Sequence, residues 1–308
     1  MPKLDELIAR KASHVIIYGD PKTGKSTLVG QLAEAGFKLL WFSMDNGHEV
    51  LRKLSKEAQD RIDIFVLPDT KEFPVAITTC LKVVSGKKVL ICHMHGQVDC
   101  STCNRSGLPL SPVELNALGL DTIVVFDHGS QLADSAMNFI CQKEKDDYKP
   151  EWEDFRVQGE LMKKVLMNIQ QAPYHVIMLA HVIETEMEDS SKRLVPQVGT
   201  VPFSKSVGKY FDHMVYCHMM NKSHRFGSST TYSMQAVTGS RTDIKVEDLK
   251  DKPSLKDLFQ FSPEKANHDS VAASASLLET KEKTAATIEK APVSTSDKVA
   301  SLLAGLKK

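Results

Sequence analysis

The sequence lacks an excess of charge of either sign, since 39 lysines and arginines balance 39 aspartates and glutamates among its 308 residues. Net charge therefore gives no general signal for nucleic acid, and any such surface must be local. The sequence also lacks an apolar run close to the roughly 20 residues of a membrane helix. Its first ten residues, MPKLDELIAR, are charged and contain no apolar signal core. We therefore expect a cytoplasmic protein with no membrane contact.

Cysteine and aromatic residues are also scarce, with six cysteines in the chain and only 6% Phe, Trp and Tyr. In a reducing cytoplasm, disulfides are not expected to stabilise the fold. The rest of the composition suits a buried core, because 42% of the residues are hydrophobic and 25% are charged. Stability is therefore expected to come from packing.

One segment near the N-terminus has the pattern of a phosphate-binding loop. Residues 19–26, GDPKTGKS, fit G-x-x-x-x-G-K-[ST]. The apolar, β-branched run at 14–18 predicts a buried strand before the loop, and a helical pattern follows it up to Gly36. Strand, loop and helix are the context that this motif needs. The residues that we expect to hold ATP are Gly19, Asp20, Pro21, Lys22, Thr23, Gly24, Lys25, Ser26 and Thr27.

The roles within this loop follow from the charge of a triphosphate. Backbone N–H groups of the loop and the N-terminus of the following helix attract phosphate oxygens. We expect Lys25 to reach the β- and γ-phosphates and the hydroxyl of Ser26 to bind Mg²⁺. Residues 122–127, TIVVFD, read as a buried strand that ends in an acid. Asp127 is therefore expected to complete the Mg²⁺ site beside Ser26.

The order of apolar runs indicates the fold class. Strand-like runs alternate with helical patterns, and nearly continuous apolar strands are typical of parallel sheets that are covered on both faces. We therefore predict an α/β fold, with a mostly parallel central sheet flanked by helices, in a domain at residues 1–261. The predicted strands are residues 14–18, 38–43, 62–67, 88–92, 122–126, 175–180, 213–217 and a run near 231–237.

A cluster of cysteine and histidine precedes the acidic strand. Residues 92–103 contain the spacing C-x2-H-x4-C-x2-C. Paired ligands at this spacing suit tetrahedral Zn²⁺, and four protein ligands predict a structural site in a small knuckle inserted at about 90–118. Two alternatives stay open: the neighbouring His93 replaces His95, or the last two cysteines form a redox pair. The predicted ligands are Cys92, His95, Cys100 and Cys103.

Further segments follow the order seen in RecA-type ATPases, namely residues 38–51 (KLLWFSMDNGHEVL), the strand that ends at Asp127, and residues 176–181 (VIMLAH). Over about residues 12–245 the chain resembles the short, phage-encoded RecA-like ATPases of single-strand annealing recombination, which often carry a Cys/His cluster before the acidic strand. The resemblance implies ATP hydrolysis stimulated by single-stranded DNA, a ring or filament of identical subunits, and the cytoplasm of the host cell. One departure is His128, which follows Asp127 where serine is common.

The resemblance also assigns roles outside the loop. Asp45 takes the position of the carboxylate that orients the attacking water, where glutamate is usual, and the shorter side chain implies slow hydrolysis. The same tripeptide, DNG, is also a turn pattern. His181 corresponds to a sensor of the γ-phosphate, and Arg241 to an arginine finger that acts on the neighbouring subunit. A satisfied core histidine and a solvated arginine are the alternatives for these two residues.

Two segments correspond to the DNA-contacting loops of RecA-like proteins, at about 142–156 and 182–209. The first carries Tyr148 and Trp152, which suit base stacking, but it is also acidic, so we assign no individual residue to DNA. The function that these features favour is ATP-dependent binding of single-stranded DNA in recombination or replication. The alternative is a nucleotide-gated interaction module, such as a loader or packaging accessory. A small-molecule kinase is disfavoured because no arginine-rich lid is visible.

Residues 262–308 form a tail of different composition. Ala, Ser, Thr, Lys and Glu dominate it, and no aromatic residue follows Phe261, so we expect disorder. Near its end Val299, Leu302, Leu303 and Leu306 recur at helical spacing after Ser296. A helix of this length is marginal alone in water, so we expect it to dock on a single-strand-binding protein or on the next subunit. A frayed tail is the alternative.

Overall fold

The computed structural model describes residues 12–145, 147–186, 191–220, 223–227, 234–241 and 254–259. Contacts divide the chain into Met1–Phe261 and Ser262–Lys308, and every described residue belongs to the first unit. The predicted disorder at 262–308 and the predicted helix near its end lie outside the described residues. Within the described parts, no helix combines the length and the apolar character that a membrane crossing needs.

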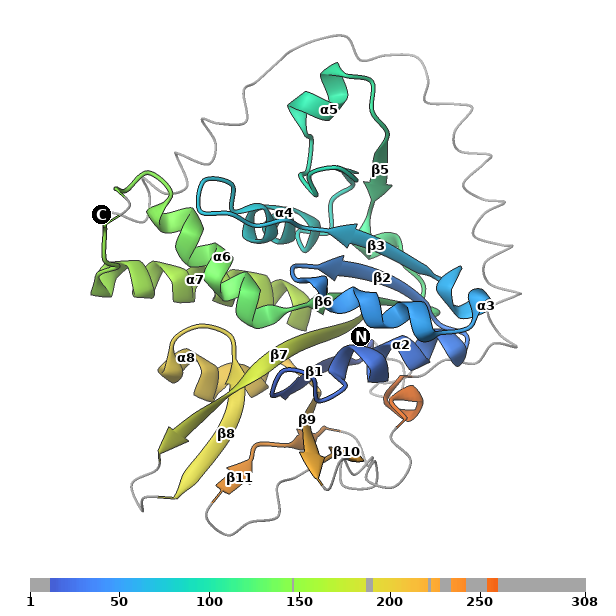
Figure 1. The fold of residues 1–308 in the computed structure, drawn as a ribbon, viewed down its shortest axis with the longest axis vertical. Helices are drawn as coiled ribbons and strands as arrows, with labels where there is room; N and C mark the ends of the chain where they lie inside the picture. Colours follow the sequence, from blue (N-terminus) through green and yellow to red (C-terminus); the bar gives the residue numbers. More distant parts are fainter. Residues whose placement is uncertain are drawn as a thin grey trace, which may run out of the picture. The chain divides into compact units, whose positions relative to one another are not determined.

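Ten of the described strands build one large sheet. Seven of them lie side by side in the order β10-β9-β1-β7-β6-β2-β3, and β8, β11 and β12 pair off this path (Figure 1). All neighbours from β9 to β3 pair in parallel, and only β10 is antiparallel along this row. The bounds are β1 (His14–Gly19), β2 (Lys38–Ser43), β3 (Ile62–Val66), β6 (Thr122–Asp127), β7 (His175–Glu186), β8 (Lys192–Gln197), β9 (His213–Met220), β10 (Ser223–Phe226), β11 (Met234–Ala236) and β12 (Gly239–Ser240).

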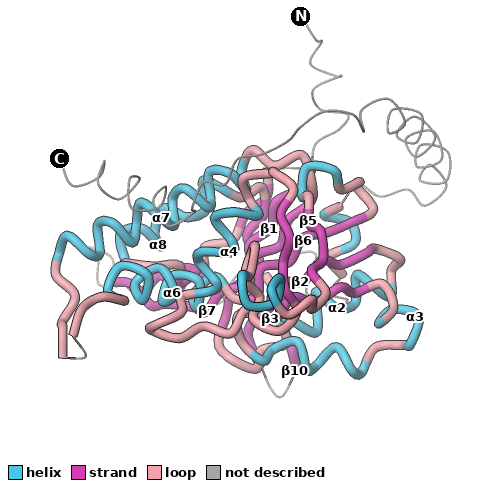
Figure 2. The backbone as a smooth tube through the Cα atoms, turned by 90° about the horizontal axis from the view of Figure 1, so that it is seen from above, coloured by secondary structure: helices cyan, strands magenta, loops and turns pink. Residues whose placement is uncertain are grey.

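Helices cover both faces of this sheet (Figures 1 and 2). In β1, Ile17 belongs to the core with Leu28, whereas Ile16 belongs to the core with Leu166 on the opposite face. This burial on both sides explains the continuous apolar strands, and the predicted α/β fold with a mostly parallel sheet is confirmed. The covering elements are α2 (Lys25–Glu34), the 3₁₀ helix η1 (Asn46–Lys53) and α3 (Lys56–Gln59) on one side, and α4 (Val75–Val83), α6 (Gly129–Cys141) and α7 (Trp152–Gln170) on the other.

The strand predicted at 88–92 exists, but it does not belong to the central sheet. β4 (Val89–Cys92) pairs antiparallel with β5 (Leu110–Val113) in a separate two-stranded sheet. The Cys/His segment and α5 (Ser101–Arg105) lie between these two strands. Because the returning end of the insertion supplies the hydrogen bonds of β4, the insertion closes on itself.

One of the two segments that the resemblance treats as loops is largely regular structure. Much of 182–209 is an antiparallel hairpin of β7 and β8, followed by α8 (Val201–Ser206) and a short 3₁₀ turn. The helix α7 begins inside the other segment, 142–156, because Glu151 and Asp154 form a capping box at its first turn. The expected loop is therefore wrong for most of 182–209, whereas the described residues of 142–151 before α7 do form a loop.

Candidate functional site

The phosphate-binding motif forms a tight loop between β1 and α2. Lys22 and Gly24 have positive φ angles of 66° and 91°, a left-handed backbone that favours glycine. A Cβ atom on Gly24 would lie 3.0 Å from His224 Nδ1, and one on Gly19 would lie 2.0 Å from Cys217 O. Both glycines of the motif are therefore needed where they stand.

Lys25 is the first residue of α2, and its side chain turns back into the loop. Its Nζ donates to the carbonyl oxygens of Gly19, at 2.9 Å, and Asp20, at 2.8 Å. Burial is the main reason why the pKa of Lys25 is lowered. The loop is tied further by Thr23 Oγ1, which donates to Asp20 O, and by His224 Nδ1, which donates to Thr23 O, both at 2.8 Å. The ammonium group is thus held inside the curl of the loop.

Ser26 and Asp127 meet between the start of α2 and the end of β6. Ser26 Oγ donates to Asp127 Oδ2 at 3.3 Å. Asp127 is buried, and this burial, followed by the charge of Asp45, raises its pKa to about 7. A hydroxyl beside a buried carboxylate is a set of hard oxygen donors, which fits Mg²⁺. The structure therefore brings together the two residues that the sequence predicts for that ion.

Asp45 follows β2, the strand next to β6, and lies at the same edge of the sheet. Its Oδ1 accepts a hydrogen bond from Gly47 N at 2.8 Å, which caps the helix η1. A Cβ on Gly47 would lie 2.8 Å from that oxygen and 3.2 Å from Asp127 Oδ2. The two carboxylates thus lie on either side of Gly47. Asp45 makes the turn that the DNG pattern predicts, and it also lies next to Asp127, the predicted Mg²⁺ ligand.

Removing the charge of Asp127 is expected to stabilise the folded protein. In the free protein with a chelator at pH 8, Asp127→Asn is expected to raise the free energy of unfolding by about 4 kcal/mol. In the folded protein the pKa of Asp127 is near 7, above the usual value of 3.8. Ionisation of this carboxyl between acid pH and pH 7 therefore opposes folding of the wild type, whereas the variant has no carboxyl to ionise. The gain should therefore grow from pH 4 to 7 and then level off.

Urea denaturation at pH 5 and pH 8 measures this gain. The matched control is Asp63→Asn, because Asp63 is exposed on β3. A gain of equal size at both pH values, or none at pH 8, would contradict the burial of an ionised Asp127.

Two histidine rings contact each other beside the loop. The ring of His181, at the point where β7 leaves the sheet core, lies 3.8 Å from the ring of His128 between centroids, with a tilt of 50°. Burial lowers the pKa of His128 to about 2, with help from His181 and Lys25, and burial followed by Lys25 lowers the pKa of His181. Ser130 Oγ accepts from His181 N at 3.0 Å. His128 is absent from the predicted site residues, and its unusual position after Asp127 is the signal that could have found it.

Arg241 lies at the other end of the sheet. Its backbone N–H donates to Asp212 O at 2.9 Å, and its guanidinium contacts Asp212 Oδ1 at 3.4 Å and Lys209 O at 2.7 Å. Asp212 also accepts from the N–H of His14, the first residue of β1, whereas the phosphate-binding loop follows the last. Within one subunit the structure therefore does not bring Arg241 to the other predicted residues. Its role as an arginine finger toward a neighbour stays a prediction.

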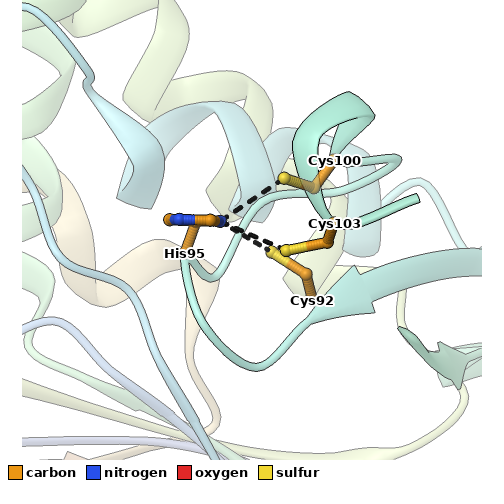
Figure 3. A group of neighbouring side chains, drawn as sticks. All are labelled: Cys92, His95, Cys100 and Cys103. Atoms are coloured by element: carbon orange, nitrogen blue, oxygen red, sulfur yellow. Dashed lines mark hydrogen bonds between the residues drawn. The ribbon is translucent and has the colours of Figure 1, made fainter. Parts of the chain in front are cut away.

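The predicted zinc ligands converge in the insertion (Figure 3). Nδ1 of His95 lies 3.8, 3.5 and 3.3 Å from the sulfur atoms of Cys92, Cys100 and Cys103. All four ligand atoms lie within 4.8 Å of one another, and the three cysteines are buried. Tetrahedral Zn²⁺ separates sulfur and nitrogen ligands by about 3.6 Å, given its usual bond lengths. The donor set and its spacing fit zinc.

The alternative ligand His93 points elsewhere. Its Nε2 hydrogen-bonds with Ser111 Oγ at 2.6 Å, and its ring stacks on Phe65 with centroids 5.3 Å apart. The structure therefore favours His95. Thr79 Oγ1 donates to Gly96 O at 2.8 Å, which anchors the turn after His95 on α4.

Two lysines of the second segment considered for DNA contact have partners. Lys192 pairs with Glu184 at 2.6 Å across the β7–β8 hairpin, and Lys209 Nζ lies 5.0 Å from the centroid of the Tyr210 ring. Trp152, at the first turn of α7, is 84% exposed and is available for contact. No contact of these residues identifies a nucleic-acid surface.

Comparison of the chain with known proteins identifies a matching family. A protein-family model described as "AAA domain" matches residues 11–245. No curated protein matches the chain. One similar solved structure is described as a prototypical ATPase from the type III secretion system of pathogenic bacteria, with 13% identity and a TM-score of 0.39. The match covers 67% of this chain and 52% of that one, so the chain spans about half the length of that structure.

Proposed function

The chain belongs to the AAA domain family of P-loop ATPases, and from this premise we propose a more specific function. The protein hydrolyses ATP slowly and uses the cycle to bind single-stranded DNA in phage recombination, annealing or replication. The observation that carries the ATPase part is the meeting of Lys25, Ser26 and Asp127 at one edge of the sheet. The DNA part rests on the order of motifs shared with the short RecA-like ATPases.

The chemistry follows from the residues at this edge. The loop N–H groups and Lys25 bind the phosphates, and Ser26 and Asp127 hold Mg²⁺, which when bound offsets charge on the β- and γ-phosphates. Asp45 orients the attacking water, and its engagement with Gly47 N explains slow hydrolysis until the turn shifts. His181 contacts the γ-phosphate. In a ring or filament, Arg241 reaches the neighbouring site only after it leaves Asp212 and Lys209.

The insertion has a structural part in this proposal. Four protein ligands leave no open coordination position, so Zn²⁺ would fix the fold of the segment instead of acting on substrate. The insertion lies beside β3, because Phe65 stacks on His93. Zinc therefore holds a surface feature in place next to the sheet.

A second candidate function is a nucleotide-gated interaction module, such as a loader or packaging accessory. The pairing of Lys192 with Glu184 favours it, because a neutralised hairpin suits a protein partner better than a phosphate backbone. In this case hydrolysis resets partner binding.

The test is the rate of ATP hydrolysis by the full chain with Mg²⁺, alone and with single-stranded DNA. The proposed function predicts a several-fold increase that duplex DNA of the same sequence does not produce. Light scattering on the same samples should show a ring or filament of identical subunits. Stimulation by a protein partner alone would support the interaction module, phosphate transfer to a metabolite would support a kinase, and the absence of hydrolysis in every condition would overturn the proposal.

A further inference from the structure

Two ring nitrogens beside the phosphate-binding loop have no hydrogen-bond partner among the described residues. They are Nε2 of His128 and Nδ1 of His181. His128 is only 3% exposed, so water does not supply the missing bond freely. A buried nitrogen without a hydrogen-bond partner destabilises the folded state. Such a group in a folded protein calls for a reason.

Packing alone does not account for these two nitrogens. Buried histidines at the other end of the sheet use ring nitrogens to stabilise the fold: His14 Nε2 bonds with Ala172 O at 3.2 Å and His213 Nδ1 with Ser240 Oγ at 2.8 Å. His175 Nε2 also lacks a partner, but its ring faces the edge of Phe259, far from any predicted ligand. The pair beside the loop differs because its two open nitrogens belong to rings that contact each other.

The position of the pair identifies a ligand. His128 directly follows Asp127, whose carboxylate contacts Ser26, and Lys25 is near enough for its charge to act on both rings. A triphosphate bound by Lys25 and Ser26 places its terminal phosphate at this end of the loop. Phosphate oxygens accept hydrogen bonds, and a ring N–H can donate one.

We propose that His128 binds the terminal phosphate of ATP together with His181, so that this pair of contacting rings distinguishes the triphosphate from the diphosphate. This inference rests on the proposed nucleotide site and adds a residue to it. His181 alone would contact the γ-phosphate from one strand. The second ring extends the contact to the strand that carries the Mg²⁺ ligand, so both strands respond to the same phosphate.

The test compares three variants of His128 by the affinity for ATP and for ADP, measured by calorimetry with Mg²⁺. His128→Leu should weaken the binding of ATP about 10- to 100-fold, because it removes a hydrogen bond to a charged group. The affinity for ADP should stay nearly unchanged. His128→Gln places an amide nitrogen near the position of Nε2 and should restore much of the ATP affinity. His128→Asn places it near Nδ1 and should not.

Thermal unfolding without nucleotide separates this role from a packing role. His128→Leu should be as stable as the wild type or more stable, since it removes a buried polar atom that has no partner. A wild-type ratio of ATP to ADP affinity in His128→Leu would overturn the proposal, and so would equal rescue by Gln and Asn. Failure of the wild-type protein to hydrolyse ATP would instead count against the proposed function, while the affinity ratio would still decide the role of His128.

Discussion

Lys25→Ala is expected to reduce ATP hydrolysis by about 100- to 1000-fold while the protein stays folded. The bonds that Nζ makes, to the carbonyl oxygens of Gly19 and Asp20, lie within the loop itself. Removing the Lys25 ammonium group takes away the charge that acts on the phosphates. The hydrophobic cores on the two faces of the sheet stay intact. Because burial lowers the pKa of Lys25, the charged side chain also opposes folding slightly, and its loss should not lower the unfolding temperature.

Two companion variants sharpen this test. Lys25→Arg keeps the charge but replaces a compact ammonium by a planar fork, and the curl of the loop should not accommodate it, so hydrolysis should stay low. Lys38→Ala removes a largely exposed lysine that pairs with Asp121, and it should hydrolyse ATP like the wild type. Steady-state phosphate release measures all three. Hydrolysis by Lys25→Ala at the wild-type rate would show that this loop is not the site of ATP hydrolysis.

The fold and the edge of the sheet that carries the site could be predicted because their signals are local. A phosphate-binding motif specifies its own strand, loop and helix, and the acid that ends β6 must lie near it in a parallel sheet. The Cys/His spacing likewise predicts a compact cluster, since its ligands fall within twelve residues of the chain. The roles of Asp45 and His181 stay predictions, but the structure does place both residues around the loop.

The errors come from pairing between distant segments. An apolar run such as 88–92 has the same appearance in a central strand and in a small hairpin, and only its partner β5 decides between them. The β7–β8 hairpin likewise depends on pairing between two segments, and the pattern within each strand does not reveal that pairing. The position of His128 after Asp127 marks it as unusual, but its contact with the His181 ring on the adjacent strand is not visible in the sequence. The placement of Arg241 likewise depends on Asp212, well before it in the chain.

Cys103→Ser is expected to abolish zinc binding by the chain and to unfold the insertion between β4 and β5. The three buried sulfur atoms and His95 form the centre of that segment, where the cysteines cluster with Leu110 apart from the main core, which takes up Val98. With so small an apolar core, the energy of metal binding is the folding energy of the insertion. Elemental analysis should find about one zinc per wild-type chain and little in the variant. Protease should then cut within residues 93–109.

A pair of histidine variants makes the assignment specific. His95→Ala should lose zinc, whereas His93→Ala should keep it, because His93 is held by Ser111 and Phe65 outside the cluster. Cys141→Ser serves as the cysteine control, since its sulfur contacts Met137 on α6. ATP hydrolysis should persist in the zinc-free variants if the metal is structural, because no ligand belongs to the loop. Wild-type protein without zinc, together with reversible oxidation of Cys100 and Cys103, would establish the redox pair in its place.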